Sequence, residues 1–347
     1  MEFLYEYGLF LAKAITFVLT FAAIIALIAA SAMKQTSKKG HLEITDLSEQ
    51  YSEVEQDVIA HLLSKEQLKE KEKQDKKVAK EQAKIDKNKA KNSVSEEKPR
   101  LFVVDFKGSV DAKEVSALRE EVSAILAVAT PKDEVFVRLE SPGGMVHGYG
   151  LASSQLDRIR QQAIPLTASV DKVAASGGYM MACVANTIVS APFAIIGSIG
   201  VIAQLPNFNK LLKKNNVDFE MFTAGEYKRT VTMFGENTDK GREKFNQELE
   251  ETHCLFKDFV GEHRPSLDLT KVATGEHWFG RQAKELGLVD AIQTSDDYLH
   301  SRGKSHQIVQ IHYATKKGLA EKLGKAASLS FDAIIAKLWQ NNRSYPH

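Results

Sequence analysis

Hydrophobic residues between positions 101 and 292 follow two alternating patterns. Short runs rich in valine, isoleucine, leucine and phenylalanine predict buried strands over residues 101–106, 134–139, 166–173 and 187–191. Between these runs, apolar residues at helical spacing predict helices over residues 115–129, 151–164 and 180–186. Strands that alternate with helices indicate an α/β domain with mostly parallel strands.

A different pattern fills the N-terminal part of the chain. Residues 14–33 carry no charge, and only Thr16, Thr20 and Ser31 interrupt the apolar run. A helix of this length, at about 1.5 Å per residue, spans roughly the 30 Å hydrocarbon core of a bilayer. The tail over residues 1–13 lacks the basic start of a secretory signal peptide. The sequence therefore predicts an uncleaved single-pass anchor, with a buried core helix and a cleaved signal peptide as alternatives.

The orientation of this anchor follows from a small charge bias. Lys34, Lys38 and Lys39 come directly after the apolar run, whereas two glutamates lie before it. The positive-inside rule then places the rest of the chain in the cytoplasm. Because few charges contribute, the membrane face of the remaining chain is left open.

Residues 34–100 have the composition of a charged spacer. Between residues 65 and 92 there are eleven lysines, six acidic residues and no aromatic residue. Such a stretch buries too little apolar surface to fold alone, although its Glu/Lys pairs allow a solvated helix. Alternatively, the lysines contact anionic lipid head groups. Residues 44–63 predict a short helix, and residues 318–338 predict an amphipathic helix within a C-terminal extension, 311–347.

Composition narrows the partners and cofactors. Lys and Arg number 46 against 45 for Asp and Glu, so the net charge of +1 excludes an overall nucleic-acid-binding charge. The two cysteines, Cys183 and Cys254, cannot build a four-thiolate zinc site or a dense disulfide framework. No phosphate-binding loop pattern occurs at the strand-to-helix turns. We therefore expect no nucleic acid, metal or nucleotide to be required.

Two glycine-bearing turns lie between predicted strands and helices. They are Glu140-Ser141-Pro142-Gly143-Gly144 and Ala174-Ala175-Ser176-Gly177-Gly178-Tyr179. Glycines let backbone N–H groups approach a ligand, where they can stabilise the negative oxygen of an acyl-transfer transition state. Small neighbours leave the hydroxyl of Ser176 uncovered, as a nucleophile requires. Each turn taken alone also fits an ordinary connection, with Ser176 as a helix N-cap.

A serine nucleophile needs a base to remove its proton. None of the ten histidines lies in a comparable turn, and His147 falls toward the next helix. Lys228 is the other candidate, in a stretch with Phe219, Met221 and Phe222. A lysine must be neutral to accept a proton. Lowering a lysine pKa from about 10.4 to about 7.5 requires roughly 4 kcal/mol, which a dry pocket supplies and a surface does not.

Five motifs in one order carry a family resemblance. The region 101–292 resembles the signal peptide peptidase family of serine peptidases, peptidase family S49. The matching motifs are Ser141-Pro142-Gly143-Gly144, Val173-Ala174-Ala175-Ser176-Gly177-Gly178-Tyr179, Gly197-Ser198-Ile199-Gly200-Val201, Gly225-Glu226-Tyr227-Lys228 and Gly280-Arg281-Gln282-Ala283-Lys284-Glu285-Leu286-Gly287-Leu288-Val289-Asp290. The resemblance covers somewhat over half of the chain, and five ordered motifs are far more specific than any single turn.

The resemblance implies a role for each matching residue. Ser176 becomes the nucleophile and Lys228 the general base. Ser198 matches a serine that hydrogen-bonds the lysine and orients it. Gly144 and Gly177 match the residues whose N–H groups form the oxyanion hole. The implied enzyme is a serine endopeptidase with a Ser/Lys dyad and no cofactor.

The resemblance also implies an architecture. Residues 101–310 would form a Clp-protease/crotonase-type spiral of strand-strand-helix units, behind a single-pass anchor in the cell inner membrane. Members of the family assemble into rings or domes with active sites near subunit contacts, so a neighbouring copy can help to hold Lys228 against Ser176. Glu140 departs from the family, which often has asparagine or aspartate there. This departure changes the local polarity and leaves the backbone donors in place.

The implied substrates are signal-peptide remnants or other membrane-associated polypeptides. Two alternatives of other classes remain open. An acyl-CoA enzyme on the same fold would share the oxyanion site, but it would not need Ser176 and Lys228 together. A catalytically inactive membrane scaffold would retain the fold without the chemistry.

Overall fold

The computed structural model describes residues 2–33, 40–71, 73–74, 76–77, 80 and 98–315 of the chain. These residues fall into two compact units, and the larger one is Leu42–Tyr313. Helix α1 (Glu2–Met33) belongs to the other unit. The predicted amphipathic helix over residues 318–338 lies outside the described residues, as does much of the lysine-rich stretch.

Helix α1 contains the apolar run over residues 14–33 and begins well before it, at Glu2. Among the helices formed by described residues, none combines the length and the apolar character needed to cross a membrane. The membrane anchor therefore stays a prediction.

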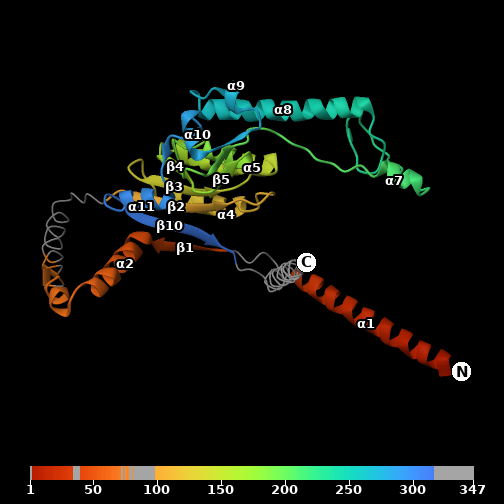
Figure 1. Ribbon diagram of the computed structural model, residues 1–347, viewed down its shortest axis with the longest axis horizontal. Coiled ribbons are helices and arrows are strands. Elements are labelled where there is room, and N and C mark those ends of the chain that lie inside the picture. The colour runs from red at the N-terminus through yellow and green to blue at the C-terminus, as the bar shows by residue number, and fades with distance from the viewer. Residues whose placement is uncertain are drawn as a thin grey trace, which may run out of the picture. The chain divides into compact units, whose positions relative to one another are not determined.

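The larger unit contains a seven-stranded sheet with the strand order β1-β10-β2-β3-β4-β6-β9 (Figure 1). Each pairing from β10 to β9 is parallel, as the strand–helix alternation predicts. The strands are β1 (His41–Asp46), β2 (Arg100–Lys107), β3 (Glu134–Glu140), β4 (Leu166–Val170), β6 (Thr187–Ser190), β9 (Ala291–Ile292) and β10 (Gln307–Ala314).

A smaller sheet carries the second glycine-bearing turn. It consists of β5 (Val173–Ala175), β7 (Ile195–Gly197) and β8 (His277–Phe279), with β5 and β7 parallel and β7 and β8 antiparallel. The single strand predicted over 166–173 is thus two strands in different sheets. The exposed pair Asp171-Lys172 forms a bend between them, because two charged residues cannot continue a buried strand. This bend moves Ser176 off the main sheet.

The two faces of the main sheet bury different side chains. Along β2, Phe102, Val104 and Phe106 join a large core with α4 and α5, whereas Leu101 and Val103 join a smaller core with α11. This alternation is the period-2 geometry of a strand buried on both faces. The helices are α2 (Leu47–Leu62), α4 (Val115–Leu126), α5 (Val146–Gln161), α6 (Gly177–Ala182), α7 (Asn209–Lys214), α8 (Asp239–His263), α9 (Leu269–Val272), α10 (Gly280–Glu285) and α11 (Ser295–Arg302).

Part of the predicted spacer is folded into the larger unit. Strand β1 is an edge strand of the main sheet, and α2 follows it directly. Asp46 caps α2 by accepting the N–H of Glu49 at 3.1 Å, and Leu47 is buried in the smaller core. The short helix predicted over 44–63 is present as α2 from Leu47 to Leu62, whereas residues 44–46 belong to strand β1.

An ion pair between Arg100 and the buried carboxylate of Asp133 stabilises the start of β2. Asp133 is 3% exposed and accepts the backbone N–H of Arg100 at 2.8 Å and its Nη2 at 2.8 Å. Burial opposes ionisation of Asp133. The hydrogen bonds from Arg100 and Thr130 outweigh it and lower the pKa of Asp133 from 3.8 to about 2.

This shift predicts a dependence of stability on acid. The pKa of the Asp133 carboxyl is lower in the folded protein than in the unfolded chain. Its contribution to the free energy of unfolding is therefore complete above about pH 4 and is lost as the pH falls toward 2. At 1.36 kcal/mol per unit, Asp133→Asn should lower the free energy of unfolding at pH 7 by about 2 kcal/mol. Urea unfolding at pH 7 and pH 3 measures this. Asp258→Asn, at an exposed site on α8, should change neither value, and an equal loss in both variants contradicts the assignment.

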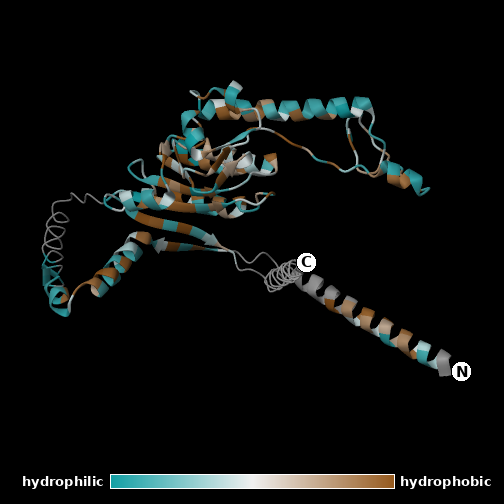
Figure 2. Ribbon diagram, viewed as in Figure 1, coloured by the Kyte–Doolittle hydropathy of each residue, from teal (hydrophilic) through white to brown (hydrophobic). Residues whose placement is uncertain are grey.

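A long excursion of the chain, here called the arm, connects the smaller sheet to α8. The arm comprises residues 203–238 and includes α7, which lies beyond the N-terminal end of α8 in Figure 1. Its two legs bind each other, since the N–H of Phe208 donates to the carbonyl of Met233 at 2.7 Å. Figure 2 shows hydrophobic residues along the arm. Those that are exposed include Leu205, Phe208, Leu211, Val217, Phe219, Met221, Phe222, Tyr227, Met233 and Phe234.

Candidate active site

The first glycine-bearing turn begins where β3 ends and is fixed by main-chain hydrogen bonds. The N–H of Ser141 donates to the carbonyl of Val173 at 2.8 Å, and the N–H of Ala175 donates to the carbonyl of Ser141 at 3.0 Å. Gly143 has φ +88°, and a Cβ there would lie 2.7 Å from the Cβ of Ser176. Only glycine fits this position, and the first turn therefore lies directly against the second.

Ser176 occupies an unusual backbone conformation at the start of α6. Its φ is +52° and its ψ is −120°, a region that costs a non-glycine residue about 1–3 kcal/mol. The backbone N–H of Ser176 donates to the carbonyl of Gly197 at 2.8 Å, which ties the turn to β7. Its side chain makes no capping hydrogen bond. The N-cap interpretation therefore does not account for Ser176, and its partly exposed hydroxyl is available for chemistry.

Two backbone N–H groups belong to glycines that line the same cavity as Ser176. Among the residues that the structure describes, neither the N–H of Gly144 nor that of Gly177 has a hydrogen-bond acceptor. Side chains are excluded at both positions: a Cβ on Gly144 would lie 2.0 Å from the carbonyl oxygen of Val110, and one on Gly177 would lie 2.4 Å from the ring of Tyr149. Two unused N–H groups beside a hydroxyl form the arrangement that an acyl-transfer oxyanion needs.

A small cavity of about 80 Å³ joins these groups. Ser176, Gly144 and Gly177 line it, so three of the five predicted site residues meet in one place. Its other walls come from α5, α6, α8 and the chain after β7. The remaining lining residues are Val146, Met180, Gly200, Val201, Ile202, Thr252 and Phe256.

Several of these lining residues could not be identified from the sequence. Thr252 and Phe256 lie on α8, far along the chain from the two turns. Their spacing of four residues places them on one face of the helix, and this spacing is the only feature of the local sequence that could have identified them. Val146 and Met180 also read as ordinary core positions.

The other two predicted residues do not line the cavity, although Ser198 directly follows Gly197, whose carbonyl accepts the N–H of Ser176. Ser198 follows β7 with φ +51°, and its N–H donates to the carbonyl of Glu276 at 2.7 Å. Lys228 is exposed, lies on the arm and does not line the cavity. Within this chain the structure thus brings Ser176 together with both glycines that were predicted to bind the oxyanion, and not with Lys228.

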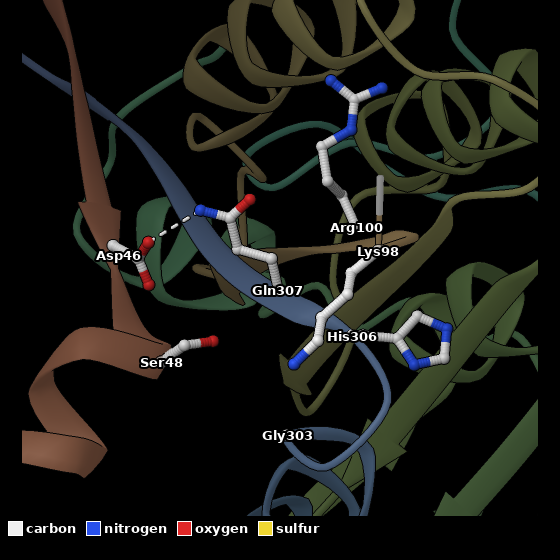
Figure 3. Close-up of a pocket in the computed structure, with 7 residues that line it drawn as sticks. All are labelled: Asp46, Ser48, Lys98, Arg100, Gly303, His306 and Gln307. Carbon is white, nitrogen blue, oxygen red and sulfur yellow. Dashed lines mark hydrogen bonds between the residues drawn. The ribbon is translucent and has the colours of Figure 1, made fainter. Parts of the chain in front are cut away.

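A larger cavity, of about 520 Å³, lies at the end of the main sheet where strands β2 and β10 begin. Figure 3 shows that Asp46 of β1 and Gln307 of β10 are joined by a hydrogen bond, at 2.8 Å. The lining residues are Asp46, Ser48, Lys98, Arg100, Gly303, His306 and Gln307. None of them belongs to the five motifs, and the two turns lie at the opposite, carboxyl ends of the parallel strands.

Potential metal ligands in the described part of the chain are dispersed, and two thiols are present. No group of three or more His, Cys, Asp or Glu residues there is arranged to hold a metal ion. Both cysteines are free thiols. Cys183 is buried, and this burial raises the pKa of its thiol, whereas Cys254 is exposed on α8.

Comparisons with known proteins place the chain among peptidases. The family model for the N-terminal part of peptidase family S49 matches residues 2–156, and the model for peptidase family S49 matches residues 158–308. A "Probable protease SohB" of Haemophilus influenzae is 54% identical over 337 residues, which cover 96% of each chain. One of Buchnera aphidicola subsp. Acyrthosiphon pisum is 50% identical over 339 residues, 98% of each chain. A relative from Methanocaldococcus jannaschii, also named a protease, is 33% identical over 195 residues, 53% of this chain and 61% of its own.

Proposed function

The chain belongs to peptidase family S49, and on this premise we propose that it is a membrane-anchored serine endopeptidase. In this proposal Ser176 is the nucleophile and Lys228 is the general base. Ser198 orients the lysine, and the N–H groups of Gly144 and Gly177 bind the oxyanion. The main support for this proposal is chemical. A conformationally strained serine whose side chain makes no capping bond lines one cavity with two backbone N–H groups that have no acceptor within the described part of the chain.

The reaction has two halves. Neutral Lys228 takes the proton of Ser176 while Oγ attacks the peptide carbonyl, and the carbonyl oxygen becomes an oxyanion held by two N–H groups. The lysine ammonium then protonates the leaving amine as the C–N bond breaks. A water molecule attacks the acyl-enzyme in the second half, giving its proton to the lysine, and Ser176 is regenerated with release of the acid product.

The position of Lys228 leads to an oligomeric proposal. An amine in contact with water keeps its proton at neutral pH and cannot act as a base until it is desolvated. Lys228 is exposed on an arm that also exposes many apolar side chains, with Phe222 89% exposed. We therefore propose that the arm packs on a second copy of the chain in a homo-oligomer. That contact would bury the apolar residues and bring Lys228 to the neighbour's Ser176.

Membrane anchoring is proposed from the sequence. The uncharged run over residues 14–33 would hold the enzyme in the bilayer, near membrane-associated polypeptides such as signal-peptide remnants. An experiment can determine which face of the membrane carries the catalytic domain. Fluorophosphonate labelling of sealed and opened inner-membrane vesicles reports activity and sidedness together. The proposed anchor is contradicted if the full chain leaves the vesicles on washing with high salt or carbonate.

The direct test of the serine mechanism is the site of covalent labelling. The purified full chain, treated with a fluorophosphonate and digested, should yield one modified peptide that contains Ser176. Labelling requires a nucleophilic hydroxyl beside working oxyanion donors, so an inactive scaffold would not react. Modification of another serine, or none, contradicts the assignment.

The cavity predicts a preference for small residues next to the scissile bond. A space of about 80 Å³ beside Ser176 accommodates an alanine or serine side chain better than a phenylalanine. Peptides with alanine there should have the higher kcat/KM. Met180→Ala should enlarge the space and shift the preference toward larger apolar residues by about tenfold. Matched peptide series measure this ratio. Met181→Ala, equally in the core but outside the cavity lining, is the control and should keep the parent's preference.

A further inference from the structure

A buried tyrosine contacts both glycine-bearing turns. Tyr149 of α5 is fully buried, and its hydroxyl lies 2.5 Å from the hydroxyl of Ser141 and 2.9 Å from the carbonyl oxygen of Ser109. Ser141 is also fully buried, and its Oγ accepts the N–H of Gly143 at 3.1 Å. These contacts form one continuous chain of hydrogen bonds beneath the first turn.

The direction of each bond in this chain is fixed by counting protons. A carbonyl oxygen only accepts, so the phenol proton of Tyr149 goes to Ser109. The single proton of Ser141 then goes to the phenol oxygen, and its Oγ accepts the N–H of Gly143. Burial raises the pKa of Tyr149, which keeps the phenol protonated for this role. The N–H of Gly143 is thereby occupied, while that of Gly144 has no acceptor among the residues described.

The ring of Tyr149 supports the second turn as well. A Cβ on Gly177 would lie 2.4 Å from ring atom Cγ and 2.7 Å from Cδ2, so the main chain of Gly177 rests directly on this ring. Phe106 packs against the same ring in an edge-to-face arrangement, with ring centroids 6.4 Å apart. One rigid side chain therefore touches the first turn through its hydroxyl and the second through its ring.

We propose that Tyr149 is a positioning residue that sets the distance and angle between the two oxyanion donors. This inference rests on the proposed serine mechanism. The Gly143 N–H → Ser141 → Tyr149 → Ser109 chain prevents the first turn from rotating, so the free N–H of Gly144 is held toward the carbonyl that Ser176 attacks. The ring fixes Gly177 at the same time. Neither Tyr149 nor Ser141 touches the substrate in this arrangement.

The experiment compares Tyr149→Phe, which keeps the ring, with the parent enzyme. Loosening one donor should lower kcat by about tenfold and leave KM within about twofold, because the donor acts on the transition state. A peptide aldehyde, whose adduct with Ser176 carries an oxyanion, should bind about tenfold more weakly to the variant. The matching peptide alcohol, which forms no adduct, should bind equally to both enzymes. Ser141→Ala combined with Tyr149→Phe should cost no more than either change alone, since both break one chain.

Tyr298→Phe is the matched control. Tyr298 of α11 is also buried, in the smaller core, and its hydroxyl donates to the carboxylate of Glu134 and lies 3.2 Å from the hydroxyl of Thr167, outside both turns. It should lower thermal stability about as much as Tyr149→Phe and leave kcat and aldehyde binding unchanged. The inference is overturned if Tyr149→Phe behaves like the parent, or if both variants lose activity equally.

A second readout does not depend on catalysis. Amide hydrogen exchange at Gly143 should be about tenfold faster or more in Tyr149→Phe, because its N–H loses an anchored acceptor. If the parent is inactive and this exchange still changes, the serine mechanism fails and the structural tie stands. Unchanged exchange overturns the proposed tie itself.

Discussion

Replacing Ser176 with alanine should abolish peptide hydrolysis, with kcat falling by about 10⁴-fold or more. The other hydroxyl that lines the cavity, on Thr252, donates to the carbonyl of Glu248 within α8 at 2.8 Å, and the two N–H donors alone retain little catalysis. The fold should survive, because the side chain of Ser176 makes no capping bond. Hydrolysis of a quenched fluorescent peptide measures the loss, and the thermal midpoint confirms folding.

Ser154→Ala provides the control for this result. Ser154 is exposed on α5, where its hydroxyl donates only to the carbonyl of Gly150 within the helix. Its loss should leave hydrolysis at the parent level. Retention of more than about one per cent of activity in Ser176→Ala would exclude it as the nucleophile.

Lys228→Ala should lower kcat by roughly 10³-fold, since no other base is assigned to the serine proton. The proposed oligomer makes a sharper prediction. When Ser176→Ala and Lys228→Ala chains are co-expressed and co-purified in equal amounts, activity should return to roughly a quarter of the parent's. A site built across two subunits is intact when one copy supplies the serine and its neighbour supplies the lysine. With random assembly each condition holds half of the time.

Two outcomes would revise this account. A mixture as inactive as the separate variants places the serine and the lysine in one subunit, which contradicts the intersubunit arrangement. Full activity of Lys228→Ala removes Lys228 as the base altogether. Lys210→Ala, at another exposed lysine of the arm, is the control and should assemble and hydrolyse peptides like the parent.

The sequence pattern was sufficient for the α/β class and for most of the strand and helix positions. Buried strands such as β2 and β3 consist mostly of apolar residues. They can therefore be predicted from their own sequence, without reference to neighbouring segments. The two turns were equally accessible, because glycine and proline mark them directly. The strand predicted over 166–173 was harder to predict correctly. The charged pair Asp171-Lys172 indicates a bend, but the placement of β4 and β5 in separate sheets depends on pairing with strands that are distant in the sequence.

The candidate site was predictable to the extent that it is local. Gly144, Ser176 and Gly177 come from two short turns, and they meet because main-chain bonds join Ser141 to Val173 and Ala175. Phe256 reaches the same cavity from α8, which no motif connects to the turns. Lys228 was assigned by resemblance alone. Its proposed contact with Ser176 would depend on the path of a long arm and on a second copy, and a local sequence pattern specifies neither.

The tie between Ser141 and Val173 has a consequence for how this enzyme can be altered. Oxyanion binding is assigned to backbone N–H groups, and main-chain bonds keep the two turns together. The groups that shape the cavity are instead side chains, including Val146, Met180 and Phe256. Substrate choice and rate acceleration are therefore separable in this architecture. A library randomised at the cavity walls should yield enzymes with new cleavage preferences while the chemical step is inherited unchanged.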